Sequence, residues 1–152
     1  MTDEARILKV QNTLAEVVRL PGGKTVAQAL QGAADKIATV RAPTLAALRA
    51  RIDGLGAVSQ AGRSGSPDAL AELYKAGNDI LGLSGAVDAP GIAEAAYSLC
   101  ELADAFGESG AANWAAIDVH LDALRILIVD DLEPSARSHI LTGLSQVRER
   151  VL

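Results

Sequence analysis

The chain has 152 residues and a net charge of −5, and hydrophobic residues make up 49% of it. This length suits one domain, and the apolar fraction excludes a disordered chain. The acidic balance and an aromatic content of only 3% argue against a nucleic-acid partner, because such partners bind basic surfaces and stacking aromatic side chains. A single cysteine, Cys100, excludes an intrachain disulfide and a cysteine-based zinc cluster.

The polar N-terminus and the shortness of the longest apolar run predict a cytoplasmic protein without membrane contact. The first residues, Met-Thr-Asp-Glu-Ala-Arg, are charged and polar with no apolar segment behind them, so we expect no signal peptide. The longest apolar run, residues 126–129, is too short to span a bilayer.

Apolar residues recur at helical spacing through the first part of the chain. A stripe over residues 7–18 ends at Pro21-Gly22-Gly23, a turn that a helix cannot continue across. A second stripe, over residues 26–40, meets Ala42-Pro43. We expect a kink or a break there, because the residue before a proline avoids the helical conformation. The stripe resumes over residues 45–55.

A Gly/Ser-rich loop, residues 61–66, separates these stripes from four further predicted helices. Ser66 is the expected N-cap of the first of them, since Pro67 and Asp68 follow it. The first three are expected over residues 67–86, from 88–90 to 107, and over residues 114–128. Residues 133–135 break the third, and Ile140, Leu144, Val147 and Val151 carry the last.

No alternating strand pattern appears, and residues 126–129 are better explained as the end of a helix than as a strand. We therefore predict an all-α fold, an antiparallel four-helix bundle with one or two additional N-terminal helices. Residues 1–152 are expected to form a single domain, with the N-terminal helices in residues 1–62 and the core in residues 66–152.

The residues that carry chemistry in other proteins form no enzyme signature here. His120 and His139 have no second metal ligand at helical spacing, so each is expected at the surface or the edge of the bundle. Cys100 lies on the apolar side of its helix and is expected to be a small buried residue. The acidic residues 130–133 form a solvated helix end. We expect no catalytic residue, no metal and no cofactor.

The helix around Asn78 is the informative one. Steps of three, four and seven residues place Ala71, Tyr74, Lys75, Leu81, Gly82 and Gly85 around Asn78, and leave Leu70, Leu73, Gly77, Ile80 and Ser84 toward the core. A glycine inside a helix costs roughly 1 kcal/mol relative to alanine, so something is expected to approach this face closely. Tight packing between helices and docking of a partner both explain the glycines.

This segment resembles the active helix of histidine-containing phosphotransfer (HPt) domains. It reads Leu73-Tyr74-Lys75-Ala76-Gly77-Asn78-Asp79-Ile80-Leu81-Gly82, followed by Gly85, where the family has approximately Ala-His-Asp-Ile/Leu-Lys-Gly. Residues 96–100, 118–125 and 141–144 are similar to later helices of short alphaproteobacterial HPt proteins, and residues 21–24 to the start of some chemotaxis-associated helical proteins. The resemblance covers roughly residues 66–152. It implies a four-helix bundle on which an exposed histidine exchanges a phosphoryl group with a receiver-domain aspartate in a phosphorelay.

The departures from this pattern remove that chemistry. Asn78 stands where the family has its histidine, and Leu81 stands where it has a lysine. An amide nitrogen is no phosphoryl acceptor, and leucine cannot neutralise an incoming phosphoryl group. His120 matches another histidine of the family, which is not the phosphoryl carrier.

The resemblance therefore implies a non-catalytic, pseudo-phosphotransferase adaptor of two-component or chemotaxis signalling. Its partner would be a receiver domain or a histidine-kinase module, bound through Tyr74, Lys75, Asn78, Leu81, Gly82 and Gly85. Two alternatives stay open. One is a structural or assembly protein that forms a homodimer, and the other is an active phosphocarrier that uses His120 or His139.

Overall fold

The computed structural model describes residues 22–87, 89–129 and 132–152, and every regular element in these residues is a helix. The prediction of an all-α chain is confirmed to that extent. The stripe expected over residues 7–18, and Asp130 and Asp131, lie outside the described residues. The chain divides into two compact units, Met1–Lys36 and Ile37–Leu152, so the first described helix shares a unit with all the later helices from Ile37 onward.

Helix α2, Val26–Arg63, begins with a reciprocal cap that the sequence analysis missed. The Gln28 amide N–H donates to Thr25 Oγ1 at 3.2 Å, and the Thr25 amide N–H donates to Gln28 Oε1 at 2.9 Å. This Thr-x-x-Gln arrangement satisfies two backbone donors that a helix start otherwise leaves open.

The expected break at Pro43 is wrong, because α2 continues through that residue. An internal proline costs a helix about 3 kcal/mol. Beyond it, however, α2 buries the side chains of Leu48, Ile52 and Leu55, each of which gains roughly 1.5–3 kcal/mol from burial. Tertiary packing therefore outweighs the local penalty. The helix also extends to Arg63 and shortens the loop predicted over residues 61–66.

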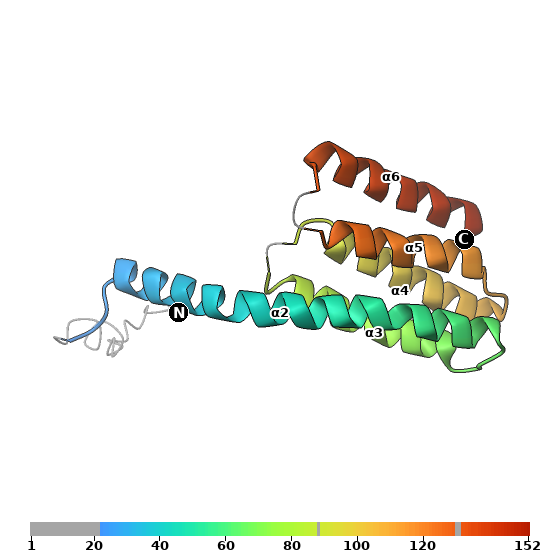
Figure 1. Cartoon of the computed structure of the whole chain (residues 1–152), viewed down its shortest axis with the longest axis horizontal. Coiled ribbons are helices and arrows are strands. Elements are labelled where there is room, and N and C mark those ends of the chain that lie inside the picture. The colour runs from blue at the N-terminus through green and yellow to red at the C-terminus, as the bar shows by residue number, and fades with distance from the viewer. Residues whose placement is uncertain (1–21, 88, 130–131) are drawn as a thin grey trace, which may run out of the picture. The chain divides into compact units, whose positions relative to one another are not determined.

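The four later helices lie within a few residues of their predicted positions. They are α3 (Ala69–Ser84), α4 (Ile92–Ser109), α5 (Trp114–Leu127) and α6 (Pro134–Val151). Within the second unit, successive helices run in alternating directions (Figure 1).

The ends of these helices are set by local chemistry. Gly91 and Gly110 bracket α4 with φ of 87° and 69°, a left-handed conformation that favours glycine. The Asn113 side chain caps α5 by accepting the Ala116 amide N–H at 3.1 Å. The expected Ser66 cap is wrong: Asp68 occupies the N-cap of α3 and makes no side-chain capping bond.

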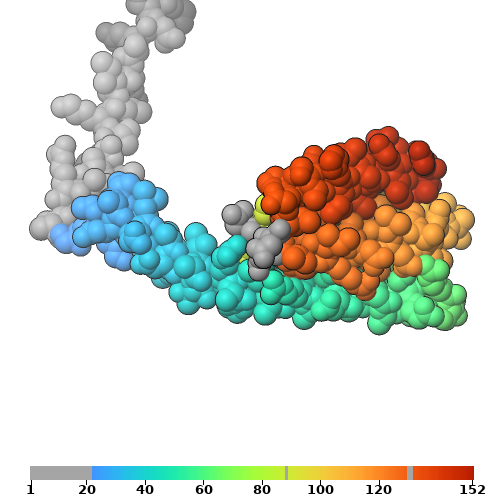
Figure 2. Space-filling model, turned by 45° about the horizontal axis from the view of Figure 1, so that its top comes forward, coloured from blue at the N-terminus to red at the C-terminus, as the bar shows by residue number. Residues whose placement is uncertain are grey.

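Helix α4 is central, since it packs against α3, α5 and α6. Helix α2 joins the same core through its buried leucine and isoleucine side chains. It is also held to α5, because Ser59 Oγ donates to Asp118 Oδ1 at 2.7 Å and Arg63 forms an ion pair with the same carboxylate. Residues of α2, α5 and α6 lie side by side on the face of the second unit in Figure 2.

Two glycines are positions of close approach inside this core. A Cβ on Gly62 of α2 would overlap the indole ring of Trp114, the first residue of α5. A Cβ on Gly77 of α3 would lie 2.6 Å from Cys100 Sγ on α4. Both glycines therefore let neighbouring helices approach more closely than any other residue would allow.

The Gly62→Ala variant is expected to lower the free energy of unfolding by about 1–3 kcal/mol, because the indole must shift to admit the methyl group. Gly54→Ala is the matched control on the same helix, since no atom lies within 4 Å of the added Cβ. It should raise stability by roughly 0.5–1 kcal/mol. Urea unfolding of both variants is the measurement, and equal stabilities would contradict the close contact.

Candidate functional site

The six residues predicted for partner binding lie together on the outer side of α3. Tyr74 is 44% exposed, Lys75, Asn78, Gly82 and Gly85 are exposed, and Leu81 is half-buried. We call this set the Asn78 face. The helical spacing that grouped the residues in the sequence is therefore preserved in the structure.

The opposite side of α3 fixes this orientation. Leu73 and Ile80 are fully buried, and Gly77 lies against α4 beside Cys100. Because the backbone at Gly77 must face α4, Asn78 and Gly82, which follow it by one and five positions, face outward.

Packing among the described residues does not explain Gly82 and Gly85. A Cβ on Gly82 would have nothing within 4 Å, and one on Gly85 would meet only the Gly82 carbonyl oxygen at 3.8 Å. Gly85 has φ of −69°, a conformation open to any residue. Of the two explanations left open by the sequence, tight helix packing applies to Gly77 and fails for these two.

The Asn78 side chain is a carboxamide, which donates and accepts hydrogen bonds but does not titrate near neutral pH. Its Nδ2 donates to the Tyr74 carbonyl oxygen of its own helix at 3.2 Å. Asp79, the next residue, forms an ion pair with Arg51 of α2. Lys75 makes no ion pair within the described part of the chain. The Asn78 face can therefore offer hydrogen bonds, one cation and apolar surface to a partner.

A groove of about 350 Å³ opens between α3 and α4 beside Tyr74. Its apolar lining comes from Leu70, Ala71 and Ala103, and Asp104, Gly107 and Glu108 of α4 complete it. The sequence analysis missed this α4 wall. The spacing of three and four residues from Asp104 indicates that these residues share a helix face, but not that this face adjoins Tyr74.

His120 is wholly buried, so its expected place at the surface is wrong. Its Nδ1 lies 2.9 Å from the Ala116 carbonyl oxygen and its Nε2 lies 2.9 Å from Ser98 Oγ on α4. Since a carbonyl only accepts, Nδ1 carries the proton and the neutral Nε2 accepts from the Ser98 hydroxyl. This pair satisfies both ring nitrogens and ties α5 to α4.

Burial lowers the pKa of His120 below its ordinary value. The hydrogen bond to the Ala116 carbonyl opposes this shift, and the Arg148 guanidinium adds to it through charge repulsion. His139 lies exposed on α6.

Cys100 is buried as the sequence predicts, with 6% of its surface exposed. Its thiol donates to the Tyr74 carbonyl oxygen at 3.6 Å, and burial raises its pKa. A protonated, inaccessible thiol is a packing residue rather than a nucleophile.

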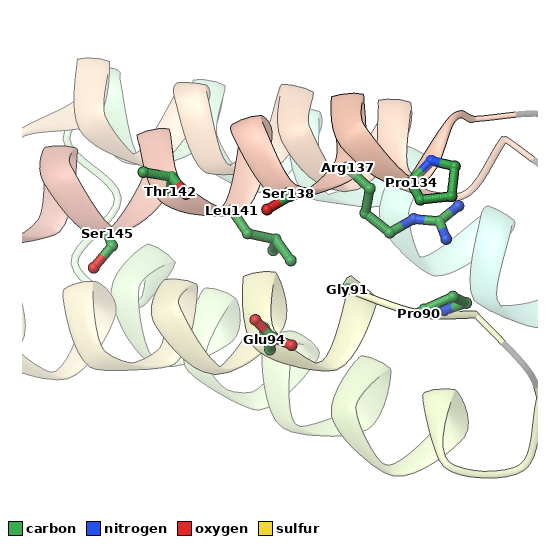
Figure 3. Close-up of a pocket in the computed structure, with 9 residues that line it drawn as sticks. All are labelled: Pro90, Gly91, Glu94, Pro134, Arg137, Ser138, Leu141, Thr142 and Ser145. Atoms are coloured by element: carbon green, nitrogen blue, oxygen red, sulfur yellow. The ribbon is translucent and has the colours of Figure 1, made fainter.

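Another groove, of about 540 Å³, lies between the start of α4 and α6 (Figure 3). Glu94 and Arg137 line it together with the hydroxyl groups of Ser138, Thr142 and Ser145. Arg137 Nε is buried without a hydrogen-bond partner among the described residues. No residue of α3 contributes, so this groove is separate from the Asn78 face.

Within the described ranges, no three His, Cys, Asp or Glu residues are grouped as metal ligands, and no helix is long and apolar enough to cross a bilayer. Comparisons with protein-family models, curated proteins and solved structures return no match for the chain. The resemblance to HPt domains therefore rests on the residues quoted for it.

The stability of the protein is expected to fall as pH falls through about 6.5. The unfolded chain then takes up a proton on His120 while the folded chain, with its lowered pKa, does not. The free energy of unfolding should drop by up to about 1.4 kcal/mol per pH unit until the folded pKa is reached. Above pH 7 both states are neutral at this residue and the effect vanishes.

Urea unfolding between about pH 7.5 and 5.5 measures this slope. The His120→Gln variant should lose the slope, whereas His139→Gln should retain it because His120 is intact. An unchanged slope in His120→Gln would assign the pH dependence to other groups.

Proposed function

We propose that this protein is a non-catalytic, HPt-like adaptor that docks a receiver domain or a histidine-kinase module of a two-component or chemotaxis pathway through the Asn78 face. In this proposal α3 to α6 form the four-helix bundle of the HPt type, and α2 is the additional N-terminal helix. The role is a cytoplasmic one, because receiver domains and kinase cores act there, and it involves no enzyme activity.

The open space above Gly82 is the observation that carries the proposal. An exposed glycine inside α3 weakens the helix by roughly 1 kcal/mol, and no close contact among the described residues compensates for that cost. In HPt domains the corresponding glycine lets the receiver approach. Tyr74 and Leu81 add apolar surface beside it, which suits a protein partner better than a phosphate group.

The same face supports a role by occupancy rather than by phosphotransfer. Asn78 cannot accept a phosphoryl group, and Leu81 supplies no charge to receive one. His120, the first alternative carrier, is wholly buried with both ring nitrogens in hydrogen bonds. His139 is exposed, so it is the alternative that phosphorylation must test.

A second candidate function, assembly into a homodimer, is favoured by the first half of α2. Val26, Leu30, Ile37 and Val40 are between 48% and 78% exposed. Large apolar side chains at helical spacing are typical of a surface that another helix covers. Sedimentation velocity of the full chain distinguishes a dimer from a monomer.

The purified protein is expected to accept no phosphoryl group from a phosphorylated receiver or an autophosphorylating kinase. Asn78→His alone should restore transfer poorly, because Leu81 leaves the site without a cation, and Asn78→His with Leu81→Lys should do better. Radiolabel transfer followed by acid-lability analysis measures this. Stable label on His139 or His120 would contradict the proposal, and equal rates for the single and double variants would refute the role given to Leu81.

The Gly82→Gln variant is expected to lose receiver or kinase binding while its helix is retained or strengthened by roughly 0.5–1 kcal/mol. The long side chain would stand where the partner must approach, and its Cβ would have no atom of another described residue within 4 Å beyond the backbone of its own helix. Gly54→Gln is the matched control, since Gly54 is also an exposed helical glycine with nothing within 4 Å. Thermal melts and pull-downs against receiver domains and kinase cores are the measurements.

Binding that is unchanged in Gly82→Gln would reject docking through the Asn78 face. Binding lost equally in the Gly54 control would indicate an indirect effect and would also count against this face.

A further inference from the structure

We propose that the α3–α4 groove beside Tyr74 receives an apolar side chain of the partner protein, presented on a helix and flanked by lysine or arginine that pairs with Asp104 and Glu108. The inference deepens the proposed function and rests on it, because Tyr74 belongs to both the groove and the Asn78 face. It names the chemistry of the surface that docks there.

The shape of the groove fits one or two side chains rather than a flat contact. Its volume is about 350 Å³, and its lining includes the half-buried Leu70 and the buried Ala103. The exposed phenol ring of Tyr74 stands at the edge, where it can cover an inserted aliphatic group. Apolar surface so arranged gains stability when another apolar group removes it from water.

Gly107 is one of the residues of α4 that line this groove. It lies inside α4 on the exposed side, and a Cβ there would have nothing within 4 Å. It belongs to the last turn of α4, and no contact among the described residues requires a glycine there. Gly82 on α3 and Gly107 on α4 are two of the exposed helical glycines, and they lie on the two helices that line the groove.

The charge around the groove selects a basic partner. Asp104 and Glu108 are both exposed, lie one helical turn apart, and form no ion pair within the described part of the chain. Glu101 on the same helix is different, because it forms an ion pair in which Arg148 Nη1 lies 2.5 Å from Glu101 Oε2. The uncompensated carboxylates repel nucleic acid and anionic lipid and attract lysine or arginine.

The test titrates short alanine-rich helical peptides into the full-length protein and follows backbone amide chemical shifts by NMR. One peptide carries a leucine flanked by two lysines, the second a leucine flanked by two glutamates, and the third only the two lysines. The leucine–lysine peptide should shift amides around Tyr74 and Gly107 and bind at least several-fold more tightly than the other two.

Charge reversal separates recognition from misfolding. Asp104→Lys with Glu108→Lys should weaken the leucine–lysine peptide by about tenfold and improve the leucine–glutamate peptide, a swap that a folding defect cannot produce. Asp53→Lys with Glu149→Lys changes the net charge equally outside the groove and should leave the preference intact. Gly107→Gln should block the leucine–lysine peptide, whereas Gly54→Gln should not.

Equal binding of the lysine and glutamate peptides, or shifts confined to another surface, would overturn the inference. Self-association of the wild type would also overturn the inference if Asp104→Lys with Glu108→Lys abolished it, because the occupant of the groove would then be a second copy of the chain. If no receiver or kinase binds and the leucine–lysine peptide still fills the groove, the proposed function alone fails. If Gly82→Gln abolishes binding of a receiver but Asp104→Lys with Glu108→Lys does not, the groove inference alone fails.

Discussion

The close approach of α3 to α4 at Gly77 is the contact on which the rest of the candidate site depends. With only 2.6 Å between a Cβ at this position and Cys100 Sγ, a side chain here would force the Cys100 thiol to move, and the Ala96 carbonyl oxygen of α4 would lie 3.5 Å from the same Cβ. The rotation of α3 about its axis is thereby fixed, and with it the outward direction of Asn78 and Gly82. The contact also brings Tyr74 beside α4, where its carbonyl oxygen accepts the Cys100 thiol, and so creates the groove between the two helices.

The polar contacts of the core hold the other helices without using the surface of α3. His120 and Ser98 join α5 to α4, and Asp118 joins α5 to the end of α2 through Ser59 and Arg63. His120, whose pKa burial lowers, pairs with Ser98 and is not among the residues that line the α3–α4 groove.

The sequence predicts what depends on local spacing and misses what depends on a partner from another helix. Leu73, Gly77 and Ile80 recur at helical intervals, so their burial and the exposure of Asn78 could be read from one segment. The burial of His120 could not, because Ser98, which satisfies it, lies on a different helix. The continuity of α2 through Pro43 has the same origin, since it depends on the burial of side chains beyond the proline. The Thr25–Gln28 cap, in contrast, is a local Thr-x-x-Gln signal that lies within one segment.

In the proposed docking, Asn78 and Leu81 stand where HPt domains have a histidine and a lysine, and this difference changes the charge of the surface that a partner would contact. A carrier must release its partner after each transfer, so its surface has to recognise a charged phosphoryl group that appears and disappears. Asn78 and Leu81 carry no charge in either state, so binding here would depend on apolar contact and on the fixed carboxylates of Asp104 and Glu108. In the proposed complex no phosphoryl transfer intervenes, so the bound fraction of the partner would depend on the concentration of the free protein relative to the dissociation constant. Under the proposed function, modulation by occupancy would therefore follow the abundance of the protein rather than its phosphorylation.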